Sequence, residues 1–382
     1  MSVHRPSRLV QIWGRLRSAD WLLMLCVFTL LLLGLSAIYS VELSQEASGF
    51  LHVKKQLIAA VVGVICFLFV TLSNYKLLQN YALALYCLCT SLLVLVLLFG
   101  ETIRGSQGWF VFGGVSFQPV ELMKIALVIT LSTYFVRRAA RPLRWRSIVE
   151  SGLIVLLPVM LVLLEPDFGS ASVLVGTWFL FLIFVGIPWR YLVSIVVVLV
   201  ALFIFSWFFL FADYQRSRIL TFVDPSVDPL DQGYNVTQAI IAIGSGGLLG
   251  SGLGFGTQSQ LKFLPESQTD FIFAVIAEEL GLLGVLLVLG SFAFLLFRLG
   301  RHAMNARDDF TSYLVLGSGA VFFLQFLVNI GMNLGLFPVT GIGLPLVSYG
   351  GSSLLTMLVL VGIVESIAIR RPIADSGSRM VS

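Results

Sequence analysis

The chain has 382 residues, of which 58% are hydrophobic and only 12% are charged. This composition excludes an ordinary water-soluble globular protein and indicates a protein that crosses a membrane several times. The formal net charge of +4 does not indicate nucleic-acid binding. Most basic residues fall on one side of the membrane in the topology predicted below, which is a topology signal.

Ten apolar segments of about 20 residues, the length that a helix needs to cross a bilayer core, follow one another along the chain. The first comes after four arginines and is too long for the core of a signal peptide, so we expect it to be retained. The predicted spans are 21–39, 53–73, 77–99, 119–136, 147–165, 169–187, 190–211, 271–297, 311–334 and 345–369. The sequence therefore predicts an all-α, polytopic membrane protein with a single domain over residues 1–382.

The basic residues are divided unevenly between the two ends of these spans. An even number of spans places both termini on one side, and 17 of the 24 Lys and Arg residues fall on that side. Because basic residues favour the cytoplasmic side of a membrane protein, both termini are predicted to be cytoplasmic.

Two long loops are predicted on the opposite, outer side, at 100–118 and, as the large loop, at 212–270. Long loops that are not low in complexity are usually functional. The first loop contains Arg104 and Trp109, which suit an aromatic anchor at the membrane surface with a basic neighbour. Alternatively, Trp109 offers a flat face to a sugar or an isoprenoid, and Arg104 contacts a phosphate group.

Two residues of opposite charge, Glu121 and Lys124, lie three positions apart and therefore share one face of the fourth span. They form either a purely structural pair or a binding site in which Lys124 holds an anionic group that Glu121 orients. In both cases this face is expected to line the interior of the bundle, because charged side chains rarely face lipid.

The segment EPDFGS, at the outer end of two closely joined spans, contains Glu165 and Asp167. A turn with helix caps is the favoured interpretation of this segment. We also keep Asp167 as a candidate substrate-binding residue.

Three further acids, Asp270, Glu278 and Glu279, lie at or inside the eighth span. Asp270, at the outer mouth, is either a helix N-cap or a general base with a pKa tuned by partial burial, and the two roles are compatible. Glu278 lies roughly 12 Å deeper along the helix. It is a candidate substrate-binding residue, because an ionisable side chain inside a membrane suggests a function.

Glycine-rich stretches at 244–256 and 335–353 interrupt the apolar pattern. The first lacks a GxGxxG motif in a βαβ setting, so we expect close backbone packing there and no nucleotide. The second precedes the last span, where irregular backbone is tolerated if it lines a cavity. The cysteines lie in apolar runs and the histidines are scattered, so neither a disulfide, a zinc site nor a haem is expected.

Four segments together resemble the SEDS family of bacterial shape, elongation, division and sporulation proteins, and the resemblance covers essentially the whole chain. They are QPVELMKIA at 118–126, EPDFGS at 165–170, FLPESQTDFIFAVIAEELG at 263–281 and FPVTGIGLPLVSYGGSS at 337–353. The large outer loop, with DYQRSRILTFVDPSVDPLDQGYNVTQ, is similar to the RodA branch more than to the division branch, FtsW.

The resemblance implies a peptidoglycan glycosyltransferase that joins lipid II units at the outer face of the bacterial cytoplasmic membrane during cell elongation. Asp270 matches the family's essential Asp and would accept the proton of the attacking hydroxyl, while Trp109, Glu121 and Lys124 match its loop Trp and in-span pair. A single inverting displacement would expel polyprenyl diphosphate. Its charge would be neutralised by Lys124, Arg104 or a divalent cation such as Mg²⁺ or Mn²⁺.

The family often has a basic residue immediately before the loop Trp, whereas this chain has Gly108. A phosphate contact from that position would therefore need another residue. The partner that the family implies is a class B penicillin-binding protein, the transpeptidase of the elongation machinery.

Two other classes of function fit parts of the sequence. A lipid II flippase would also use about ten spans and broken helices, but a transporter should carry polar residues near the membrane midplane. Here the acids lie towards the outer end. A non-catalytic scaffold would leave Asp270 and Glu121 unexplained, so the sequence favours an enzyme.

Overall fold

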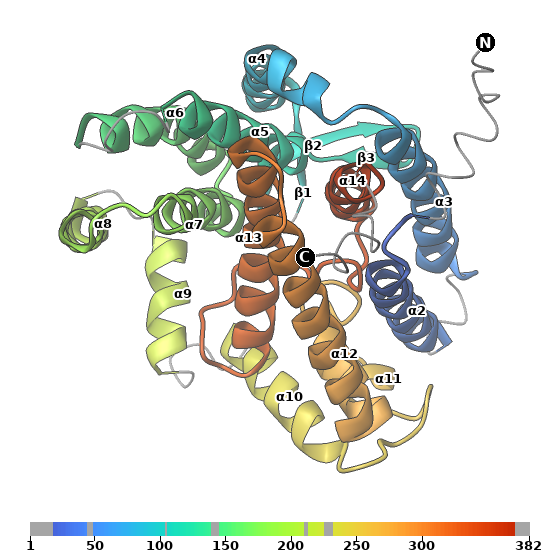
Figure 1. Cartoon of the computed structure of the whole chain (residues 1–382). Coiled ribbons are helices and arrows are strands. Elements are labelled where there is room, and N and C mark those ends of the chain that lie inside the picture. Colours follow the sequence, from blue (N-terminus) through green and yellow to red (C-terminus); the bar gives the residue numbers. More distant parts are fainter. Residues whose placement is uncertain are drawn as a thin grey trace, which may run out of the picture.

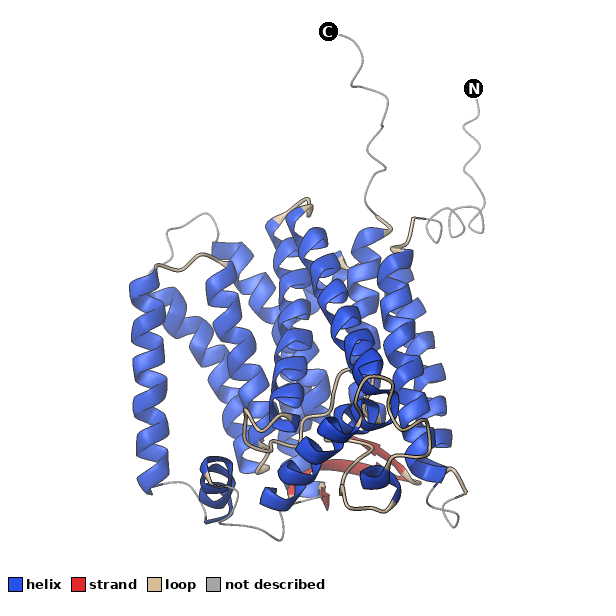
Figure 2. Ribbon diagram, turned by 90° about the horizontal axis from the view of Figure 1, so that it is seen from below, coloured by secondary structure: helices blue, strands red, loops and turns tan. Residues whose placement is uncertain are grey.

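The structure is a computed structural model that describes residues 18–43, 49–103, 105–138, 145–209, 213–224 and 232–370. In these ranges nine helices are long and apolar enough to cross a membrane, and a tenth apolar helix, α7, has 17 residues. The ten helices form an upright bundle (Figures 1 and 2). They are α2 (Trp21–Leu43), α3 (Leu51–Leu72), α4 (Lys76–Phe99), α5 (Pro119–Arg138), α6 (Trp145–Leu164), α7 (Phe168–Phe184), α8 (Trp189–Phe209), α12 (Ile272–Met304), α13 (Asp309–Asn333) and α14 (Gly351–Ala368). Each corresponds to one predicted span, so the predicted polytopic helical fold is confirmed.

The two ends of the described chain meet at one end of the bundle. Ser18 Oγ donates a hydrogen bond of 3.4 Å to the carbonyl of Ile369. Next to this contact, the Asp20 carboxylate lies 2.6 Å from both Arg298 Nη2 and His302 Nε2. Burial opposes ionisation of Asp20, but the hydrogen bonds from His302 and Arg298 outweigh it and lower the pKa of Asp20 to about 2. We refer to this arginine-rich end as the cytoplasmic end.

The loops at the opposite, outer end contain secondary structure that the sequence did not predict. Figure 2 shows strands and short helices gathered at this end of the bundle. The first loop forms an antiparallel sheet in the order β1-β2-β3, from Glu101–Ile103, Ser106–Phe112 and Val115–Phe117. The described part of the large loop forms α9 (Asp213–Val223), α10 (Gln232–Ser245) and α11 (Thr257–Gln260).

The helix α12 is broken at Gly281, whose φ of 62° and ψ of −156° are not helical. The glycine-rich segment after α10 packs against this break and pairs with its backbone. Ser251 N donates to the carbonyl of Glu278 at 3.0 Å, and Leu282 N donates to the carbonyl of Gly247 at 2.9 Å. A Cβ atom at Gly246 would lie 1.9 Å from the carbonyl oxygen of Ala277. The predicted close backbone packing of this stretch is therefore confirmed, because a side chain at this position would not fit.

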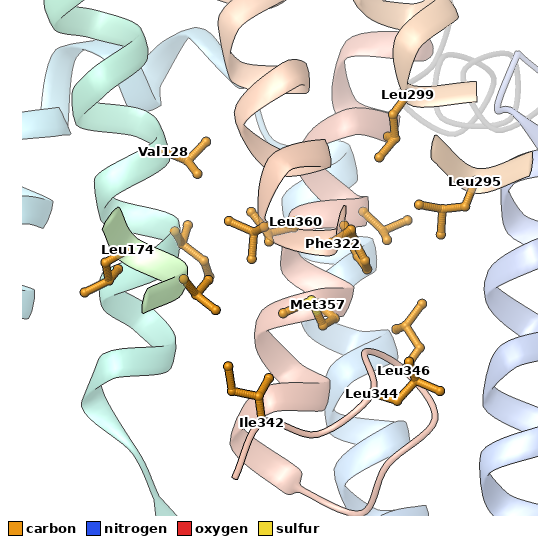
Figure 3. Close-up of a cluster of buried hydrophobic side chains, with 14 of the residues drawn as sticks. Val128, Leu174, Leu295, Leu299, Phe322, Ile342, Leu344, Leu346, Met357 and Leu360 are labelled. Carbon is orange, nitrogen blue, oxygen red and sulfur yellow. The ribbon is translucent and has the colours of Figure 1, made fainter. Parts of the chain in front are cut away.

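The most enclosed helices lie at the centre of the bundle. Of the membrane-spanning windows of α5 and α14, 78% is buried, compared with 11% for α8, which stands at the edge (Figure 1). Figure 3 shows the apolar core, where Met357 of α14 and Phe322 of α13 lie above Ile342, Leu344 and Leu346 of the loop before α14. This core supports the loop from the side that faces the membrane interior.

Candidate active site

A cavity of about 120 Å³ opens at the outer end, between α5, α7, the segment just before α12, α13 and the loop that leads into α14. Five of the seven predicted site residues line it: Trp109, Glu121, Lys124, Asp167 and Asp270. Residues from four separate segments of the sequence therefore meet at one place. Arg104, the sixth, lies outside the described residues.

The half-buried residue Asp270 is held through its backbone at the start of α12. Its carbonyl oxygen accepts hydrogen bonds of 2.9 Å from both Asn329 Nδ2 and Asn333 Nδ2 of α13. The N-cap residue of the helix is Phe271, and Asn333 Oδ1 accepts from Ala274 N at 3.3 Å. Asp270 is therefore not the N-cap residue, and an amide of α13 binds the first turn.

Lys124 and Glu121 form a buried ion pair on the wall of the cavity. Lys124 Nζ lies 2.7 Å from Glu121 Oε1, and the two residues are 2% and 6% exposed. Glu121 Oε2 is also buried and has no hydrogen-bond partner among the described residues. Leaving a buried carboxylate oxygen unpaired is costly, so this oxygen is a candidate ligand for a cation or for a hydroxyl group of a substrate.

Asp167 caps α7, as the sequence predicted, and also lines the cavity. Its Oδ1 accepts from Ser170 N at 2.8 Å, and its Oδ2 accepts from Ser170 Oγ at 2.7 Å and from Gln118 Nε2 at 3.1 Å. Both carboxylate oxygens are therefore engaged within the protein. This arrangement suits a residue that orders the cavity wall.

The loop before α14 is attached to the segment that precedes Asp270. Ser348 Oγ donates to the carbonyl of Thr269 at 2.5 Å, and Tyr349 N donates to the carbonyl of Gln268 at 2.8 Å. From the other side, Asn329 Nδ2 donates to the carbonyl of Ile342 at 2.8 Å. The irregular backbone predicted here does line a cavity, and side chains satisfy several of its polar groups.

Gln325 is a cavity residue that sequence reasoning missed. It is 1% exposed, and its Nε2 has no hydrogen-bond partner in the described chain. It lies four residues before Asn329, hence on the same face of α13. The signal available in the sequence was the spacing of Gln325, Asn329 and Asn333 by four residues in an otherwise apolar span.

Trp109 lies half-buried on β2, opposite Glu101 of β1. The preceding residue, Gly108, packs on Glu165, so that a Cβ atom at this position would lie 2.8 Å from Glu165 Oε2. Glu165 is fully buried, and neither of its carboxyl oxygens has a partner among the described residues. Burial, together with the charge of Asp167, raises the pKa of Glu165 to about 8. Burial therefore favours the neutral form of Glu165 at pH 7.

Glu278, the seventh predicted site residue, lies away from the cavity. Its carboxylate is fully buried and accepts hydrogen bonds from Gln258 N at 2.7 Å and from Ser259 N at 3.2 Å. Its neighbour Glu279 accepts from Ser40 Oγ of α2 at 2.6 Å. This geometry gives no support to substrate binding by Glu278, because its oxygens hold α11 against α12.

Among the described residues, no three His, Cys, Asp or Glu side chains are grouped as a metal site. A protein-built cage for a metal ion is therefore absent from this part of the chain. Mg²⁺ commonly takes one or two carboxylates and completes its ligands with water and substrate phosphates. The cavity offers one unpaired carboxylate oxygen, Oε2 of Glu121, and the Asp270 residue also lines it.

Comparisons with known proteins agree on one family. The model of the cell cycle protein family of FtsW, RodA and SpoVE matches residues 20–372. The chain is 45% identical over 298 residues to the peptidoglycan glycosyltransferase MrdB of Escherichia coli K12, covering 77% of this chain and 79% of that protein.

Two solved structures share the fold. A chain from a peptidoglycan synthase complex, described as coordinating polymerization and crosslinking, has a TM-score of 0.78 and 32% identity, covering 92% of this chain and 97% of that one. The rod shape determining protein RodA of Thermus thermophilus has a TM-score of 0.68 and 31% identity, covering 92% and 96%. The predicted similarity to the RodA branch agrees with these matches.

The substitution Glu165→Gln tests the buried neutral carboxyl. The folded protein keeps the Glu165 proton between its ordinary pKa of 4.5 and the raised pKa of about 8. The unfolded chain releases that proton within this window, so stability falls as pH rises, by at most about 1.4 kcal/mol per pH unit. The variant should match the wild-type Tm at pH 5 and exceed it by several degrees at pH 9, measured by scanning fluorimetry in detergent.

The matched control for this experiment is Glu101→Gln, which changes an exposed glutamate of β1, next to the strand that carries Gly108. Its Tm should follow the wild-type curve. Wild-type and Glu165→Gln curves that run parallel from pH 5 to pH 9 would contradict a raised pKa for Glu165.

Proposed function

The chain belongs to the SEDS family of FtsW, RodA and SpoVE cell cycle proteins, and on this basis we propose that it is a peptidoglycan glycosyltransferase of the RodA type. It polymerises lipid II into glycan strands at the outer face of the bacterial cytoplasmic membrane. One observation carries the proposal: the cavity at the outer end brings Asp270 together with the Lys124–Glu121 pair and Trp109.

Asp270 acts as the general base in the proposed reaction. It accepts the proton of the GlcNAc 4-hydroxyl of one lipid II molecule while that oxygen attacks the anomeric carbon of the MurNAc at the end of a lipid-linked strand. The bond from this carbon to the diphosphate oxygen breaks, and polyprenyl diphosphate leaves. The backbone clamp from Asn329 and Asn333 supports this role, because a general base must be held within hydrogen-bond reach of its proton.

Lys124 neutralises charge on the leaving diphosphate. A buried ammonium group stabilises a developing anion more strongly than an exposed one, because little solvent screens it. Trp109 provides a flat apolar face for a sugar ring or for the first isoprene units. Asp167 contributes by fixing Gln118 and the start of α7.

We also propose that a divalent cation, Mg²⁺ or Mn²⁺, would assist at the diphosphate, with the unpaired Oε2 of Glu121 as a protein ligand. Such a cation would neutralise part of the diphosphate charge.

Polymerisation should therefore stop when EDTA is added and recover with excess Mg²⁺. A rate that EDTA does not change would refute this part of the proposal.

The proposed partner is a class B penicillin-binding protein, the transpeptidase that crosslinks the new strands within the elongation machinery. The support for this partner is the structural similarity to a chain that was solved in a peptidoglycan synthase complex. Assays of polymerisation therefore require both proteins, with the partner in a form unable to transpeptidate.

Replacing the proposed base tests the function directly. The substitution Asp270→Asn keeps the shape of the side chain but removes its basicity. Glycan formation from lipid II by the complex should fall at least about 100-fold, since general base catalysis typically contributes 10² to 10⁴. Electrophoresis of labelled glycan strands measures the product, and co-elution with the partner checks folding.

The matched control is Asp309→Asn, an exposed aspartate at the cytoplasmic end of α13, which should leave the rate unchanged. If Asp270→Asn polymerises at the wild-type rate, Asp270 is not the base. If no variant and no wild type makes polymer while labelled lipid II crosses the bilayer of reconstituted vesicles, the protein is a flippase.

Gln325 is the proposed hydrogen-bond donor to substrate inside the cavity. The substitution Gln325→Met keeps the length of the side chain and removes the amide. We expect KM for lipid II to rise about fivefold to tenfold with little change in kcat, since one hydrogen bond contributes about 0.5–1.5 kcal/mol. Steady-state kinetics of the complex measure both constants.

The same variant, Gln325→Met, would behave differently if Gln325 has no role in substrate binding. If Gln325 does not contact substrate, the variant relieves an unpaired buried amide. The kinetic constants would then stay at wild-type values while the Tm rises.

A further inference from the structure

A second cavity, of about 690 Å³, lies at the cytoplasmic end of the bundle between α4, α5 and α6. It is on the opposite side of the membrane from the candidate active site, and the proposed reaction does not use it. In Figure 1, α4, α5 and α6 lie beside one another. The residues that line the cavity are Gln79, Asn80, Ala82, Leu83, Thr130, Thr133, Tyr134, Arg137, Arg138 and Ile154.

The mouth of this cavity is basic and rich in hydrogen-bond donors. Arg137 and Arg138 are the last residues of α5, and Gln79 and Asn80 lie in the first turns of α4. Arg138 is paired with Glu150 and stacks over the ring of Tyr134 at 5.0 Å. Arg137 is exposed and forms no ion pair with any described residue. Its guanidinium group is therefore available to an anion at the mouth.

The inner part of the cavity has apolar walls. Ala82, Leu83 and Ile154 form its walls one to two helical turns from the mouth. Tyr86 Oη donates to the carbonyl of Ile154 at 2.7 Å and joins α4 to α6 beneath the cavity. Leu83 is 71% exposed towards the outside of the bundle, so the apolar wall continues onto the face that contacts lipid.

We propose that this cavity binds the phosphate headgroup of an anionic phospholipid of the inner leaflet. The planar guanidinium of Arg137 matches phosphate oxygens, and the amides of Gln79 and Asn80 donate to the same group. The acyl chains run along Leu83. Basic pockets between membrane helices on the cytoplasmic side suit such headgroups. A soluble phosphate would use the mouth but not the apolar wall, so the combination favours a lipid.

Native mass spectrometry of the purified full chain in detergent tests the proposal. Phosphatidylglycerol and phosphatidylcholine with identical acyl chains are titrated separately, and bound lipid is counted at each concentration. We expect phosphatidylglycerol to bind about tenfold more tightly, because the choline cation of phosphatidylcholine offsets the negative charge that the arginines at the mouth attract. Arg137→Gln should remove most of this preference.

The matched control is Arg190→Gln, because Arg190 is also an exposed arginine at the cytoplasmic end but does not line this cavity. It should keep the preference for phosphatidylglycerol. A second variant, Leu83→Trp, places bulk on the apolar wall at an exposed position. It should weaken the binding of both lipids without lowering the Tm.

Three results would overturn the proposal. Equal retention of the two lipids by the wild type would exclude recognition of the headgroup charge. Equal losses in Arg137→Gln and Arg190→Gln would indicate nonspecific surface attraction. Displacement of phosphatidylglycerol by an equal concentration of glycerol 3-phosphate would show that the site takes a soluble phosphate instead of a lipid.

Discussion

The need to pair every backbone polar group inside the bundle shapes the outer half of this protein. At the start of α12, two asparagine amides of α13 donate hydrogen bonds to the carbonyl of Asp270. One of these amides, that of Asn329, also donates to Ile342. The position of the general base and the position of the loop that covers the cavity therefore depend on the same side chains of one rigid helix.

The same requirement explains the acids that do not reach the cavity. The break at Gly281 frees backbone groups of α12, and the glycine-rich segment at 246–252 pairs with them. Glu278 and Glu279 then fix the chain around this segment through α11 and α2. An unpaired charge at this depth is costly. Here loop amides and hydroxyl groups donate hydrogen bonds to Glu278 and to Oε1 of Glu279, while Glu279 Oε2 is buried without a partner among the described residues. Asp270 is the acid of this segment that lines the cavity.

The sequence revealed the features that depend on the length of the apolar runs and on the positions of charged residues. The ten spans were predicted because each is a long apolar run, and Asp270 and Lys124 were found because charges inside such runs are rare. Neutral amides such as Gln325 and Asn329 do not disturb the apolar pattern, so their place in the site became visible with the structure. Strands of three residues, such as β1 and β3, are too short for alternation to be recognised. The partners of Glu278 could not be predicted, because the cost of burying a charge does not reveal which group pairs with it.

The contact between Gly108 and Glu165 has a consequence for how this part of the protein can change in evolution. A basic residue in place of Gly108 would lie next to the Glu165 carboxyl, whose neutral form burial now favours. The added cation would favour the ionised carboxylate, and the two side chains would form an ion pair. A substitution at position 108 would therefore alter the effect of a substitution at position 165, so the effects of the two substitutions on stability would not add. Positions 108 and 165 therefore form an epistatic pair, and relatives with a cation before the loop tryptophan are expected to differ in the protonation of this buried acid.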